Sequence, residues 1–291
     1  MRIALVLALI AVLCWSTVAT AFKFALESLS PIQLLLNSSL VATVTLLLIS
    51  LGPKRLEWVK HPWTIKRFFL LLIAAGLNPC IYYFCLFEAY DRLMAQQALA
   101  LNYTWPFALV LLHGVIRLSF PKPLSLLYLL IGFTGILVSS GAYSFSLNSI
   151  DYIGVLFALS SAVVWALYWL IQKIVTGDEL INLTVSFSFA SLILVIFIPF
   201  TDQMTMKDLV SSCYVGVMEM AIPFYLWSMA VRRVDKPERI VTLMYLSPVL
   251  SVIWISIVLG ETLYYNTIIG LILILVSSVL CVRQQAQESS E

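Results

Sequence analysis

The chain has 291 residues, of which 62% are hydrophobic and 11% are charged, and its mean hydropathy is +1.00. Soluble domains are about 45–50% apolar and about 25% charged, so this composition excludes a soluble globular protein and predicts an integral membrane protein. The net charge of +2 gives no indication of nucleic-acid binding, and the five cysteines lie in apolar segments without metal-ligand spacing. We expect no metal and no cofactor.

Ten apolar stretches follow one another along the chain, each near the length of about 20 residues that crosses the hydrocarbon core. They lie near residues 3–22, 31–52, 68–87, 95–116, 124–141, 152–172, 183–200, 209–231, 240–259 and 266–282. The loops between them leave no room for a soluble domain, which argues against an enzyme or a receptor. The first stretch resembles a signal peptide at Ala19-Thr20-Ala21, but its match to a later segment argues against removal.

The second half of the chain repeats the first. Residues 8–26 align without a gap to residues 158–176, which pairs Trp15 with Trp165. Pro106 and Pro248 lie in similar segments, and each half ends on the same pentapeptide, at 136–140 and 274–278. We therefore predict two repeats, 1–146 and 147–283, and a polar, disordered tail at 284–291. Because each repeat holds five spans, the second must be inverted in the membrane, as in many secondary transporters.

The distribution of Lys and Arg between the predicted loops is strongly unequal. One side of the membrane receives Arg2, Lys54, Arg55, Lys60, Lys66, Arg67, Arg117, Lys122, Lys173, Arg232, Arg233, Lys236, Arg239 and Arg283, and the other receives only Lys23, Arg92 and Lys207. Since cytoplasmic loops are the positive ones, we expect both termini in the cytoplasm, with the chain in a bacterial inner membrane.

One carboxylate, Glu219, falls near the middle of the eighth span. A charge at the bilayer centre costs about 2.5–3.5 kcal/mol even on the lenient scale, so Glu219 must face a cavity, pair with a partner, or be protonated. Aligning the halves on Ala89 and Ala230 places Asn78 opposite Glu219. We expect both side chains to contact the substrate near the midplane, with Glu219 binding an ammonium group or a proton. The alternative is a protonated Glu219 that only bonds neighbouring helices.

Prolines and aromatic residues gather in the same spans. Pro79, Pro106, Pro223 and Pro248 predict helix breaks in the third, fourth, eighth and ninth spans, and such breaks mark binding sites in transporters. The aromatic and polar side chains that we expect to line the cavity with Asn78 and Glu219 are Tyr82, Asn102, Tyr103, Trp105, Trp165, Tyr168, Trp169, Trp227 and Tyr245. This lining suits a mid-sized amphipathic solute, although many of these rings could serve helix packing instead.

Several segments resemble the ten-helix EamA-type members of the drug/metabolite transporter superfamily. They are LIAVLCWSTVATAFKFAL in the first span, VVWALYWLIQKI in the sixth, and YLSPVLSVIWISIVLGETL over 245–263, where Gly260-Glu261 matches the Leu-Gly-Glu ending of the family. LNYTWPFALVLL looks like the Asn-Tyr-x-Trp-Pro stretch of the bacterial aromatic amino acid exporters. The first half departs from the pattern, with Leu118-Ser119 in place of Gly-Glu, and Glu219 matches no signature. The resemblance implies a basket of helices around a central cavity, with the fifth and tenth spans at the periphery.

These observations predict a secondary transporter that exports amino acids or related small metabolites by alternating access. The absence of a buried Lys or Arg at the centre of the inner spans disfavours phosphorylated substrates. S-adenosylmethionine and cationic drug-like compounds remain alternatives. A non-transporting membrane scaffold or a lipid-flipping subunit is the alternative of another class. We expect a small-molecule substrate, contact with the lipid bilayer, no nucleic-acid partner, and a monomer or weak homodimer.

Overall fold

A computed structural model of the chain describes residues 2–52, 62–116, 123–140, 151–197, 204–233 and 242–288, and within these ranges all regular structure is helical. The first half contains α1 (Arg2–Leu26), α2 (Pro31–Leu51), α4 (Ile65–Ala75), η1 (Gly76–Ile81), α5 (Tyr82–Arg92), α6 (Ala95–Asn102), α7 (Trp105–Ile116) and α8 (Pro123–Ser140). The second half contains α9 (Tyr152–Gln172), α10 (Glu179–Phe197), α11 (Met206–Val215), η3 (Gly216–Ala221), α12 (Ile222–Val231), η4 (Thr242–Tyr245), α14 (Leu246–Leu259) and α15 (Tyr265–Glu288).

Seven helical stretches in the described ranges are long and apolar enough to cross a membrane. They are α1, α2, the continuous stretch Ile65–Arg92, Ala95–Ile116, α9, Glu179–Ile196 and Met206–Val231, and two shorter apolar helices follow at Leu246–Leu259 and Tyr265–Ser277. The fold is therefore that of an all-helical, multi-pass membrane protein.

The C-terminal tail differs from expectation. Helix α15 continues to Glu288, so residues 284–288 are helical where the polar composition predicts disorder. Gln, Ala and Glu are good helix formers, and they extend a helix that the preceding apolar residues have already nucleated.

Two long helical stretches are interrupted at their centres by a π-helical turn, η1 between α4 and α5 and η3 between α11 and α12. Each turn begins at a glycine, Gly76 or Gly216. Within η1, Asn78 leaves the helical region (φ −136°, ψ 118°) and Pro79 lacks the N–H that a regular helix requires. Both interruptions free backbone groups at the middle of a membrane-spanning stretch.

The other three prolines singled out in the sequence lie in the first turns of helices. Pro106 is the second residue of α7, Pro223 the second of α12 and Pro248 the third of α14. Proline is tolerated there because the N–H groups of the first turn have no carbonyl acceptor within the helix. Each of these prolines therefore follows a break between two helical segments.

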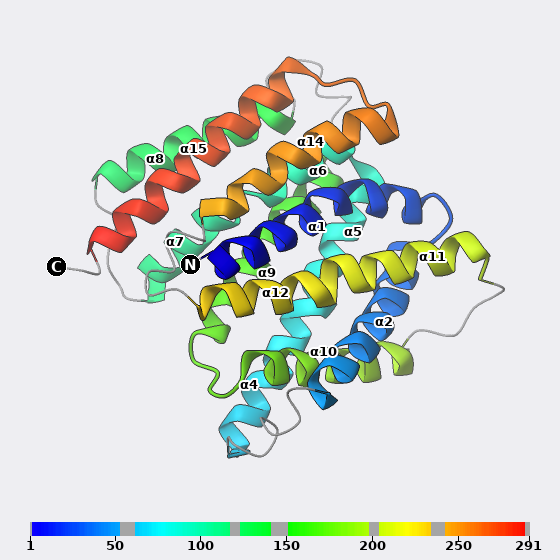
Figure 1. The fold of residues 1–291 in the computed structure, drawn as a ribbon. Coiled ribbons are helices and arrows are strands. Elements are labelled where there is room, and N and C mark those ends of the chain that lie inside the picture. Colours follow the sequence, from blue (N-terminus) through cyan, green and yellow to red (C-terminus); the bar gives the residue numbers. More distant parts are fainter. Residues whose placement is uncertain are drawn as a thin grey trace.

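Helices of each half of the chain pack against helices of the other half (Figure 1). Helix α1 lies beside α12 and α14, whereas α9 lies beside α5 and α7. In the same way α11 contacts α2, and α4 contacts α10. Helices α8 and α15 form a separate pair at one edge, where Gly135 lies so close to the Gly270 carbonyl that a Cβ would come within 2.8 Å of it.

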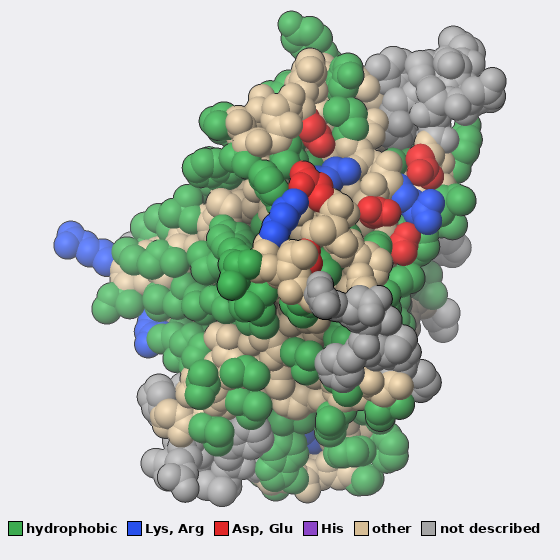
Figure 2. Space-filling view, turned by 90° about the vertical axis from the view of Figure 1, so that its right-hand side faces the viewer, with side chains coloured by type: hydrophobic (Ala, Val, Ile, Leu, Met, Phe, Trp, Pro, Cys, Tyr) green, Lys and Arg blue, Asp and Glu red, His purple; other side chains and the backbone are tan. Residues whose placement is uncertain are grey.

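The two ends of the bundle are defined here by α1. Face A is the end at which α1 begins, and there Ala4 and Ala8 pack with Trp227 and Ala230 near the end of α12. Face B is the end at which α1 finishes, where Glu27 pairs with Lys207 at the start of α11 (2.5 Å). Figure 2 looks onto face B and shows acidic and basic side chains beside one another amid a largely hydrophobic surface.

Candidate functional site

Two adjoining cavities lie against α1, α9 and α12, and the first also reaches α5, α6 and α7 whereas the second reaches α10. The first, on the face-B side, is lined by Trp15, Val18, Phe22, Tyr82, Leu86, Tyr90, Leu99, Asn102, Tyr103, Trp105, Trp165, Glu219, Phe224 and Met244. The second, on the face-A side, is lined by Trp15, Trp165, Tyr168, Trp169, Gln172, Glu179, Leu180, Leu183, Phe224, Tyr225, Trp227, Ser228 and Met244. The two share Trp15, Trp165, Phe224 and Met244, which therefore lie where the cavities adjoin, and we call these four residues the constriction.

Aromatic rings in contact with one another build this constriction. The Trp15 ring lies 5.5 Å from that of Phe224 and 5.6 Å from that of Trp227, centroid to centroid. On the opposite side Trp165 lies 4.6 Å from Tyr82 and 5.8 Å from Phe224. Rings at these separations attract one another beyond simple burial, so they hold a defined wall.

Glu219 is the acidic side chain of the first cavity, and it reaches there from the π-helical turn η3. Its side chain is buried, and Oε1 accepts a hydrogen bond from the Tyr83 hydroxyl (3.0 Å). Its backbone carbonyl accepts a hydrogen bond from the Trp15 indole N–H (3.4 Å), which joins η3 to α1. Oε2 has no hydrogen-bond partner among the described residues.

The charged side chains that line the two cavities are acidic. The described residues that line them include Glu219 and Glu179 but no Lys, Arg or His. An ionised Glu219 would therefore lack a basic partner in the cavity, and a cation or a proton can supply the missing charge.

The space inside is small. The volume of the first cavity is about 70 Å³ and that of the second is about 40 Å³, which is room for a few waters. A metabolite would enter only if the ring wall or the surrounding helices moved apart. Within the described ranges no group of three or more His, Cys, Asp or Glu gathers as a metal site would require.

The EamA-like transporter family model matches residues 2–141 and 152–283, which is nearly the whole chain and both of its halves. The chain belongs to the EamA-like transporter family. The family is described as one of transporters, and each half of this chain matches its model once.

Two further comparisons find proteins that are similar to this chain. A protein of Clostridium kluyveri, described as an uncharacterized transporter, is 28% identical over 141 residues, which are 46% of this chain and 45% of that protein. The match thus spans less than half the length of this relative. A solved crystal structure superimposes with a TM-score of 0.62 over 99% of both chains at 19% identity, a likeness that shows the fold alone.

The structure brings most of the predicted site residues of this EamA-like transporter to the cavities. The first is lined by Tyr82, Asn102, Tyr103, Trp105, Trp165 and Glu219, and the second by Trp165, Tyr168, Trp169 and Trp227. Asn102 also donates from Nδ2 to the Ser161 hydroxyl (2.8 Å), which fixes α6 to α9. Tyr245 ends the 3-10 helix η4, and its side chain lies outside the described part of the structure.

Asn78 is placed differently. It is buried in η1, but it lines neither cavity, and its amide lies on the side of Tyr168 in α9. Neither Nδ2 nor Oδ1 has a hydrogen-bond partner among the described residues. The expected meeting of Asn78 and Glu219 in one lining is therefore not seen, because Glu219 lines the first cavity whereas Asn78 lies toward Tyr168 of α9.

Three residues of the constriction were not among the predicted site residues: Trp15, Phe224 and Met244. The repeat contains the signal for Trp15, because it aligns with Trp165, and both residues line both cavities. Phe224 and Met244 carry no such signal, since an apolar residue in an apolar helix gives no indication of its direction.

Proposed function

We propose that this chain is a secondary transporter that exports amino acids or related small metabolites across a bacterial inner membrane by alternating access. The observation that carries the proposal is the pair of cavities at the helix breaks, with an aromatic constriction between them and Glu219 beside it. A constriction between a face-A and a face-B compartment is what alternating access requires, because a carrier must close one side before it opens the other.

An inverted repeat of five spans plus five is supported by the exchanged packing. Helix α1 contacts α12 and α14 as α9 contacts α5 and α7, so each half offers the same helices to the other. The breaks η1 and η3 also occupy matched places, each beginning at a glycine. We propose that two groups of helices, each drawn from both halves, rock about the cavities.

Face A is proposed to be the cytoplasmic one. Arg2, Lys66, Arg67 and Arg232 lie at this face, at the start of α1, at the start of α4 and after α12, whereas Lys23, Arg92 and Lys207 lie at face B. Positive residues gather on the cytoplasmic side of membrane proteins. Transport from face A to face B is then export.

The lining favours a substrate with an amino group. Glu219 can receive an ammonium group, and the rings of Trp15, Trp165 and Phe224 offer apolar and cation–π contacts. Aromatic amino acids are the first class to test, because Asn102, Tyr103 and Trp105 line the same cavity. S-adenosylmethionine or cationic drug-like compounds form the second candidate class, favoured by the absence of a basic side chain from the described linings.

Counterflow in proteoliposomes tests the proposal. Vesicles preloaded with a mixed amino acid pool are expected to take up labelled aromatic amino acids only when the preload is present. Protein-free vesicles and vesicles without preload are the controls. If no amino acid is taken up by folded protein while a cationic compound is, the second class replaces the first. Lack of uptake for both classes removes the substrate proposal.

A further inference from the structure

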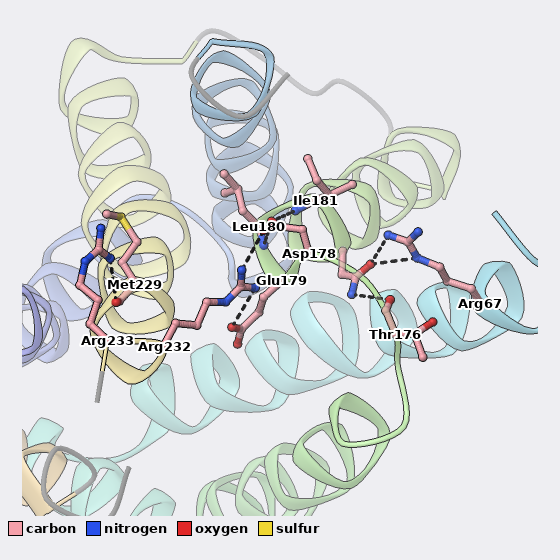
Figure 3. Close-up of polar contacts among 10 residues, drawn as sticks. Arg67, Thr176, Asp178, Glu179, Leu180, Ile181, Met229, Arg232 and Arg233 are labelled. Carbon is pink, nitrogen blue, oxygen red and sulfur yellow. Dashed lines mark hydrogen bonds and ion pairs between the residues drawn. The ribbon is translucent and has the colours of Figure 1, made fainter. Parts of the chain in front are cut away.

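A polar cluster at face A joins three elements that are far apart in the sequence (Figure 3). Arg67 comes from α4. Asp178 directly precedes α10 and Asn182 lies in its first turn, whereas Arg232 follows α12. Arg67 and Asp178 are almost fully buried, with 3% and 4% of their surface exposed. Buried charges at the end of a membrane protein are costly unless they are paired, so the cluster requires an explanation.

The loop before α10 is fixed to α4 through Arg67. The Arg67 Nε and Nη2 donate to the Asn182 side-chain oxygen (3.2 and 2.7 Å), and the guanidinium lies 4.2 Å from the Trp63 ring centroid. Gly177 lies against this guanidinium with φ +107°, and a Cβ there would come within 2.6 Å of Nη2. Glycine is the residue that combines this conformation with this closeness.

Asp178 has two roles in the cluster. Its Oδ1 accepts hydrogen bonds from the backbone N–H groups of Leu180 (2.9 Å) and Ile181 (3.3 Å), so it caps the start of α10. Its Oδ2 accepts from Nη1 of Arg232 (2.8 Å). The second role ties the end of α12 to the start of α10.

This ion pair joins the ends of two helices that line the face-A cavity, although neither of its two residues belongs to the lining. Leu180 and Glu179 of α10 line that cavity from one side and Ser228 of α12 lines it from the other. Nη2 of Arg232 also lies 3.6 Å from the Glu179 carboxylate, on the same rim. Separating α10 from α12 would widen the cavity toward face A and would break both contacts.

The counterparts of these residues at face B are arranged differently. The loop between α1 and α2 is held to α11, where Ser28 donates to Asp208 (2.5 Å), much as Asn182 holds Arg67 at face A. Arg92, at the end of α5 as Arg232 is at the end of α12, pairs with Glu88 of its own helix (3.1 Å) and lies over the Phe157 ring. Arg232 at face A therefore pairs with a different helical segment, whereas its counterpart Arg92 at face B pairs within its own helix.

We propose that the Arg232–Asp178 ion pair is a latch that holds the face-A mouth of the cavity closed, with Arg67 as the positioning residue that keeps Asp178 in place. The latch must open each time the face-A cavity admits solute. This inference rests on the proposed alternating access, and it assigns to Arg232, Asp178 and Arg67 a gating role apart from the substrate cavity.

Accessibility of the face-A cavity tests the latch without any substrate. Ser228→Cys in the full chain, placed in lipid nanodiscs, is treated with a charged, membrane-impermeant thiol reagent, and modification of position 228 is read by peptide mass spectrometry. Arg232→Gln and Asp178→Asn should each speed modification about two- to fivefold, the shift expected when one partly exposed ion pair is lost. Asp178→Asn keeps the cap on α10, because Asn is also a good capping residue.

The chain offers a matched control in Arg233, the neighbour of Arg232. Its Nη1 donates to the Met229 carbonyl of its own helix (2.9 Å), so Arg233→Gln should leave the rate unchanged. Arg232→Lys, which keeps a charge, should return the rate toward that of the parent, and the double variant of Arg232 and Asp178 should not exceed either single variant. Thermal stability of each variant separates gate opening from unfolding.

Two outcomes distinguish the latch from the transport proposal. Equal modification rates in Arg232→Gln and Arg233→Gln, with both proteins folded, would overturn the latch even if counterflow is observed. Faster modification in Arg232→Gln together with no counterflow for any solute would leave the latch standing and remove the substrate assignment.

Discussion

Glu219→Gln is expected to reduce counterflow about tenfold or more and to remove its pH dependence, because a hydrogen bond to a charged group contributes about 1.5–3 kcal/mol. Gln has nearly the same shape as Glu and can still accept from the Tyr83 hydroxyl, which lies 3.0 Å from the Glu219 Oε1. Folding should therefore be preserved. The Gln amide, however, neither takes up a proton nor carries the negative charge that would pair with an ammonium group. Uptake rates at several pH values, in vesicles of equal protein content, provide the measurement.

Glu179→Gln is the matched control, since Glu179 is the other acidic residue of the cavities but is half-exposed at the rim. This variant should keep the pH dependence. Glu219→Asp retains a carboxyl group and should keep part of the activity. If Glu219→Gln transports at the original rate with the original pH profile, the carboxyl only bonds neighbouring helices, and its proposed role in coupling is wrong.

Gly216→Ala is expected to destabilise the protein by about 1–3 kcal/mol, the usual cost of overpacking a tight interior. A Cβ at this position would lie 2.6 Å from the Ser38 carbonyl oxygen and 2.7 Å from the Val41 Cβ, both on α2. The backbone of η3 could accept the methyl group only by moving away from α2. This movement would also displace Glu219, which follows Gly216 by three residues. The fraction of monodisperse protein remaining after heating in detergent reports the loss.

Gly76→Ala is the natural comparison, because Gly76 begins η1 as Gly216 begins η3. A Cβ on Gly76 meets no heavy atom within 4 Å, so this substitution should leave the melting temperature close to that of the parent. Equal sensitivity of the two variants would show that the glycines serve the π-helical turns themselves and not the contact with α2.

Helix positions were largely predictable from the sequence, and the differences at helix ends have local causes. The predicted span 152–172 coincides with α9, where Asp151 caps the first turn by accepting from the Gly154 N–H (2.8 Å). The span predicted from 183 begins earlier, at Glu179, because Asp178 caps α10 and an acidic residue is favourable in a first turn. Hydropathy marks the apolar part of a helix, whereas capping decides where it begins.

The depth of the site residues in the membrane was predictable from the sequence, but the orientation of their side chains was less so. Matching the halves placed Glu219, Trp165 and their neighbours at the level of the cavities, and the structure lines the cavities with them. It could not orient Asn78, because Asn78 itself leaves helical geometry, so helical spacing does not give the direction of its side chain. The exclusion of Asn78 and the inclusion of Trp15 both depend on how helices pack, and packing is set by contacts between distant segments.

The exchanged packing of α1 has a consequence for the order of assembly. Most neighbours of this helix, α11, α12 and α14 among them, belong to the second half and are synthesised last. Until they arrive, α1 has few protein surfaces on which to dock, and the Trp15 indole has not met the Glu219 carbonyl to which it donates. The first half thus remains an incompletely packed bundle in the bilayer until the last third of the chain is inserted. The helices of that last third then pack against α1, the helix that was inserted first.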